Sequence, residues 1–62
     1  MKVYRVFFFG SPQGIDIKAK KAEWFGESNE QKALMLTGNG DKLVASFAPG
    51  AASSFVVVEA LQ

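Results

Sequence analysis

The chain has 62 residues, a formal net charge of +1, and neither cysteine nor histidine. This length allows one small domain, covering residues 1–62, and a domain of this size buries only about 60% of the surface of its unfolded chain. The missing residue types exclude disulfides, thiolate metal sites and the commonest general base of enzymes. The near balance of seven basic and six acidic residues does not fit a dedicated nucleic-acid binder.

Residues 1–9 are rich in valine, tyrosine and phenylalanine, and residues 10–14 (GSPQG) are turn formers, so the pair predicts a strand followed by a turn. Three consecutive phenylalanines end this strand, although neighbouring side chains in a strand point to opposite faces. One face carries Tyr4, Val6 and Phe8, and the other face is equally apolar. Since neither set is stable in water, one set must form the core and a second structure must cover the other.

Residues 14–25 predict a second strand with one irregularity. Its first half alternates isoleucine with charged residues, but strict alternation would bring charges onto the isoleucine face further along. A slip of one residue near Lys20, as a β-bulge provides, places Trp24 on the isoleucine face and predicts that it is buried. Without the slip, Trp24 shares a face with Lys18 and Lys20.

A short helix is one interpretation of the segment that follows. Ser28 and Gln31 have the spacing of a capping box, and Gly38 is suited to the position after the last helical residue. This alternative predicts a helix around 29–37 and an α+β fold.

A hairpin is the interpretation that we favour for the same region. Apolar runs at residues 32–36 and 43–48 flank Asn39-Gly40, a dipeptide typical of type I′ turns because both positions tolerate positive φ. A turn centred there pairs Leu36 with Leu43.

The chain ends in another predicted strand, over residues 53–61, after a turn at residues 48–50 (APG). Its centre, FVVV, is apolar on both faces. The whole pattern predicts a mostly β fold, with a small antiparallel sheet or a partly open barrel of four to five short strands.

No pattern of reactive residues indicates an enzyme, and we expect no catalytic residue, no metal site and no cofactor. Catalytic sites pair a nucleophile or an acid with a tuned base, and calcium loops need oxygen ligands at alternating positions. The carboxylates are scattered along the chain instead: Asp16, Glu23, Glu27, Glu30, Asp41 and Glu59.

Weak binding of single-stranded nucleic acid is the alternative function. Small β-sheets bind single strands through aromatic side chains that stack on bases and basic side chains that contact phosphates. The residues that would form such a site are Arg5, Lys18, Lys20, Lys21 and Trp24.

A non-catalytic, self-associating protein-interaction module is the function that the sequence favours, because two strands are apolar on both faces and a single small sheet cannot cover both. Obligate interfaces resemble a core cut in half. The predicted contact residues are Tyr4, Val6, Phe8, Val56 and Val58. No segment approaches the ~20 apolar residues of a membrane span, so we expect a cytoplasmic homodimer, or a complex with another protein, away from membranes.

Overall fold

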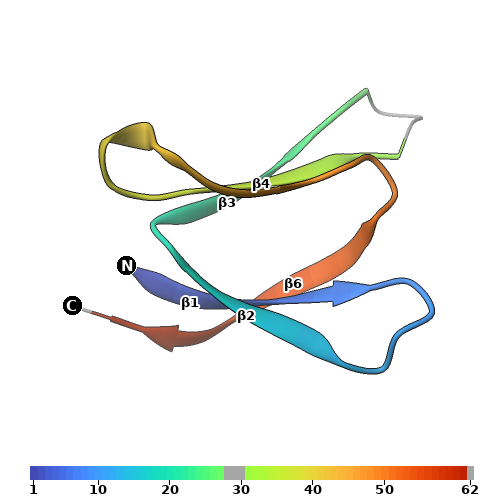
Figure 1. Cartoon of the computed structure of the whole chain (residues 1–62), viewed down its shortest axis with the longest axis horizontal. Coiled ribbons are helices and arrows are strands. Elements are labelled where there is room, and N and C mark those ends of the chain that lie inside the picture. The colour runs from blue at the N-terminus through green and yellow to red at the C-terminus, as the bar shows by residue number, and fades with distance from the viewer. Residues whose placement is uncertain (28–30, 62) are drawn as a thin grey trace.

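Six strands make up the computed structural model, which describes residues 1–27 and 31–61 (Figure 1). A short 3₁₀ turn, η1 (Asn39–Asp41), joins two of them. The strands are β1 (Lys2–Phe8), β2 (Gly14–Ala19), β3 (Lys21–Phe25), β4 (Ala33–Thr37), β5 (Leu43–Phe47) and β6 (Ala52–Ala60).

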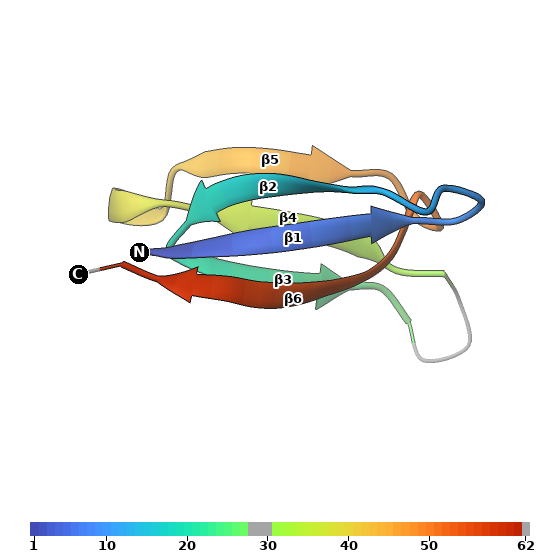
Figure 2. The ribbon, with the colours of Figure 1, turned by 90° about the horizontal axis from the view of Figure 1, so that it is seen from below.

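The strands form two antiparallel sheets that face each other and do not close into a barrel (Figures 1 and 2). Sheet A has the order β2-β1-β6, and sheet B has the order β3-β4-β5. In the view of Figure 2, β3 lies behind β6, so the first strand of sheet B covers one edge of sheet A. The predicted mostly β, antiparallel fold is confirmed, with six strands in place of four or five.

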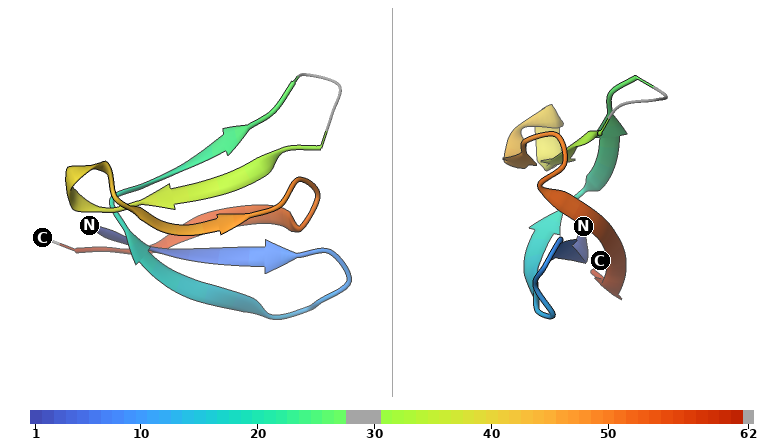
Figure 3. Two further views of the ribbon diagram at one scale, coloured as in Figure 1. Left: turned by 45° about the horizontal axis from the view of Figure 1, so that its top comes forward. Right: turned by 90° about the vertical axis from the view of Figure 1, so that its right-hand side faces the viewer.

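The extra strand arises at Lys20, where the predicted second strand divides. β2 pairs with β1, whereas β3 pairs with β4 in the other sheet. The amide of Lys20 donates a hydrogen bond of 2.7 Å to the carbonyl of Thr37, which ties the corner to sheet B. The irregularity was therefore predicted at the correct residue, but it is a change of sheet and not a bulge within one sheet. Figure 3 shows the chain crossing between the layers there.

The predicted hairpin is present as β4 and β5, and Asn39 and Gly40 lie in its turn. The predicted pairing of Leu36 with Leu43 is wrong, because Leu36 pairs with Ala45 and a register shift follows it. A turn longer than two residues explains the difference, since the Gly38 amide donates to the Lys42 carbonyl at 2.7 Å across three intervening residues.

The alternative helix around 29–37 is wrong over 33–37, which form β4. Residues 28–30, which include Ser28 of the proposed capping box, lie outside the described residues.

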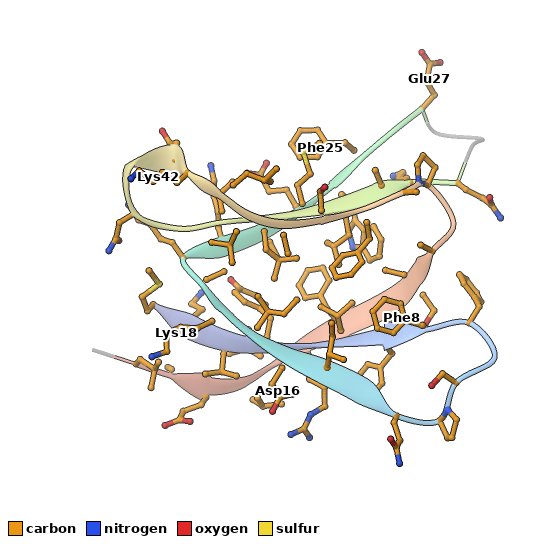
Figure 4. All side chains as sticks on the ribbon, viewed as in Figure 1. Phe8, Asp16, Lys18, Phe25, Glu27 and Lys42 are labelled. Carbon is orange, nitrogen blue, oxygen red and sulfur yellow. The ribbon has the colours of Figure 1, made fainter. Side chains whose placement is uncertain are left out.

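The core lies between the sheets and combines aliphatic side chains with the aromatic ring of Tyr4. Figure 4 shows Phe8 between the two layers, with Phe25 pointing away from sheet A. The ring of Phe8 lies edge-on to Phe47 of sheet B, with 5.3 Å between centroids. The face of β1 with Phe8 thus forms the core, and Phe7 points outward. The buried residues are Tyr4, Val6, Ala19, Leu34, Leu36 and Ala52.

Candidate protein-binding edge at strand β6

Strand β6 is the longest strand and forms one edge of sheet A. It has nine residues, and among the residues that the structure describes it pairs with β1 alone. Val56, Val57 and Val58 expose 48%, 48% and 41% of their surfaces. No charged residue precedes Glu59 in this strand. A long, uncharged, apolar edge of this kind is a template for pairing with another strand.

Two register shifts divide β6 into a regular centre and irregular ends. Ser54 to Val57 pair one-to-one with β1, whereas Ser53 and Val58 are the extra residues at the shifts. In the regular centre, Val57 lies opposite Tyr4 and therefore shares the inner face of sheet A. Val56 lies opposite Arg5 on the outer face.

The remaining sheet edges carry features that discourage pairing. β2 contains Asp16 and Lys18, and β3 contains Lys21 and Glu23. Charged side chains on an edge strand oppose the approach of another strand. β5 is uncharged, but it has five residues, against nine in β6. β6 is therefore the edge best suited to accept a strand.

The side of the molecule at which β3 faces β6 exposes apolar side chains. Trp24 of β3 packs against Phe55 of β6, with 5.7 Å between ring centroids. Trp24 nevertheless exposes 38% of its surface, and Val57 faces inward beside it while remaining half exposed. The predicted burial of Trp24 is therefore wrong. The residue faces the core side of sheet B as predicted, but it lies on the edge strand β3 and stays partly exposed.

The predicted contact residues fall on two different faces. Tyr4 and Val6 are buried in the core, and Phe8 is partly buried beside them, so their assignment to an outer contact face is reversed. The alternation of the sequence divides the side chains of β1 correctly between its two faces. Both faces are apolar, however, and the position of sheet B decides which face is covered. Val56 and Val58 are exposed, as the expectation requires.

The residues predicted to bind nucleic acid do not share a face. Lys18 lies opposite Val3 on the outside of sheet A, whereas Lys21 lies on the outside of sheet B. Trp24 faces the other way from Lys21, because it is three positions along the same strand. Lys20 lies at the corner between the sheets.

Two of the basic residues predicted to bind nucleic acid, Arg5 and Lys21, form ion pairs with acidic side chains. The Arg5 guanidinium donates to both carboxylate oxygens of Asp16, at 2.8 and 3.1 Å, and Lys21 lies 3.0 Å from Glu23. Hydrogen bonding from Arg5 lowers the pKa of Asp16 below its ordinary value. The Arg5–Asp16 pair borders a shallow, open hollow on the outer face, which Phe7, Pro12, Gln13 and Gly14 also line. The stacking platform that the alternative function requires is not assembled.

Sequence reasoning missed the contribution of Phe55 and Val57 to an exposed inner face. The uncharged run from Ala52 to Val58 is the feature of the sequence that indicates this face. It does not show which strand of the other sheet packs on it. Within residues 1–27 and 31–61, no group of three or more acidic side chains is placed to hold a metal ion. In the same part of the chain, no helix has the length and apolar character needed to cross a membrane. Compared with protein families, curated proteins and solved structures, the chain shows no match.

Proposed function

We propose that this chain is a non-catalytic protein-interaction module that self-associates by adding a strand to the free edge of β6. The observation that carries the proposal is the unpaired edge itself, with three half-exposed valines and no charge from Ala52 to Val58. Strand addition supplies backbone hydrogen bonds along the edge, and the side chains that flank it supply selectivity.

The small core gives association a physical advantage. Six residues form the buried core of the described chain, and domains near this size are marginally stable without a partner or a covalent link. Burying the valines of β6 removes apolar surface from water at about 25 cal/mol per Å². Association therefore supports the fold as well as serving as its function.

Amide hydrogen exchange followed by NMR tests the proposal residue by residue. In an edge strand, alternate amides point toward the neighbouring strand and the others point to solvent. In the associated protein, both alternating sets of β6 amides are protected. A Val57→Lys variant should lose protection at one set, because a charge facing inward on an edge strand is solvated when free but buried on pairing.

Met35→Lys is the matched control. Met35 is a similarly exposed apolar residue on the outer face of sheet B, so this variant should keep protection of both sets. If alternate β6 amides of the unmodified protein exchange as rapidly as exposed loop amides, the proposed function is wrong. Equal loss of amide protection in the Val57→Lys and Met35→Lys variants would show that the contact does not lie at β6.

A further inference from the structure

The geometry of β6 restricts how a second copy can pair with it. Two identical antiparallel strands in one sheet are related by a two-fold axis perpendicular to the sheet, as in other isologous contacts. Residues directly opposite each other in an antiparallel pair point to the same face. The axis must therefore pass midway between a residue and its own copy, which lie directly opposite each other, and the outer faces of both copies lie on the same side.

The sequence of β6 selects Val56 as that residue. Val56 is the middle residue of Ala52–Ala60 and lies in the regular centre of the strand. When the two copies of Val56 are opposite each other, Phe55 lies opposite Val57 of the second copy, Ser54 opposite Val58, and Ser53 opposite Glu59. Moving the axis to Val57 would place the charged Glu59 opposite Phe55. Moving it to Phe55 would replace the apolar pair of Phe55 and Val57 with Val56 opposite Ser54.

We infer that the partner of β6 is the β6 strand of a second copy of this chain, antiparallel and with the two copies of Val56 opposite each other across the two-fold axis. This inference rests on the proposed function and adds which strand of the second copy pairs with β6, its direction and its register. The two copies of sheet A become one continuous sheet with the order β2-β1-β6-β6-β1-β2.

The position of sheet B supports a second copy over an unrelated strand. β3 lies over β6 on the inner side of sheet A (Figure 2). The two-fold axis therefore brings together the sides of the two copies at which β3 faces β6. The half-exposed Trp24 and the inward-facing Val57 then meet their counterparts across the seam. An isolated strand would pair with the backbone of β6 but would supply no second layer to cover Trp24.

The charge of the surface also fits a dimer. The seam between the β6 strands has Glu59 as its charged residue in each copy, and this register places no like charges opposite each other.

Single cysteines test the register, and the chain contains no native cysteine to interfere. Opposite residues of antiparallel strands have Cα atoms about 4.5–5.5 Å apart, within the 4.4–6.8 Å that a disulfide spans. Val56→Cys should therefore form a covalent dimer on oxidation or with a short thiol-to-thiol linker. Ser54→Cys is the matched control, because it also points outward in the regular part of β6 and its two copies would lie about 13 Å apart along the strands.

The outcomes separate this inference from the proposed function. Conversion of Val56→Cys to covalent dimer, with Ser54→Cys remaining uncrosslinked, supports the inferred register. Cross-linking of Ser54→Cys, or none in a Val56→Cys protein that has the mass of a dimer when reduced, overturns the register while strand addition at β6 stands. A protein of monomer mass whose β6 amides exchange alternately overturns both.

Discussion

Asp16 is the residue whose ionisation should influence stability through a defined contact. Its carboxylate accepts two hydrogen bonds from Arg5, and these lower its pKa. A depressed pKa in the folded state stabilises the fold at pH above the ordinary value of about 3.9. That stabilisation is lost as the pH falls through the lower, folded pKa.

We therefore expect the free energy of unfolding to fall more steeply on acidification below about pH 4 in the unmodified protein than in an Asp16→Asn variant. Urea unfolding at a series of pH values measures this difference, and an NMR titration of the Asp16 carboxyl gives the pKa directly. Titration of Asp16 at its ordinary value would contradict the prediction.

Leu34 is a residue on which the small core depends. It is fully buried between the sheets, so Leu34→Ala should reduce the free energy of unfolding by about 2–5 kcal/mol. A 62-residue domain has a total stability of roughly 3–9 kcal/mol, so this variant should lose a large fraction of its stability and unfold at a much lower urea concentration. Leu43→Ala is the control, since Leu43 is 58% exposed and its loss should change stability by about 0.5 kcal/mol or less. Similar effects of the two substitutions in urea unfolding would contradict the placement of the core.

Phe8 shows what residue-level reasoning from the sequence achieves and where it stops. The alternation of β1 separates Phe8 from Phe7 correctly, and it also shows that both faces are apolar. It cannot say which face is covered, because that depends on where sheet B lies. Since Phe8 packs against Phe47 in the core, a Phe8→Lys substitution should unfold the chain.

The turn between β4 and β5 is the element whose geometry gives the next prediction. Gly40 has a φ of +69°, and no heavy atom lies within 4 Å of the position that a Cβ would occupy. Gly40→Ala should therefore destabilise the fold by about 1–2 kcal/mol through backbone strain alone. Gly40→Asn should cost less, because asparagine adopts this conformation more readily. Equal midpoints of thermal unfolding for the glycine and alanine proteins would contradict this account of the turn.

The sequence identifies strands and turn positions more readily than it identifies pairing. The Asn39-Gly40 turn and the irregularity at Lys20 were both predicted at the correct places. The register of β4 with β5 was not, because Asp41 also adopts a positive φ of 59° and lengthens the turn beyond two residues. The division of β2 from β3 could not be predicted, because a bulge and a change of sheet produce the same one-residue slip in the pattern.

For the whole molecule, two apolar faces on one strand predict a second layer. That layer can come from the same chain or from a partner. Sheet B covers the inner face of β1, so the chain itself buries Phe8. β6 is the strand that still lacks a cover, because its edge is unpaired and its valines are exposed in the described part of the folded chain. The candidate site could be predicted as an apolar strand, but its role as an edge follows only from the sheet order β2-β1-β6.

The mass of the unmodified protein in solution, measured by sedimentation equilibrium across a range of concentrations, tests self-association most directly. The chain has a mass of 6.7 kDa. Our account predicts a reversible rise to about 13.4 kDa, twice the chain mass, with no larger species, because a two-fold contact through β6 closes on itself. A mass that stays at 6.7 kDa up to millimolar concentration would contradict the account, and so would a mass that continues to rise beyond the dimer.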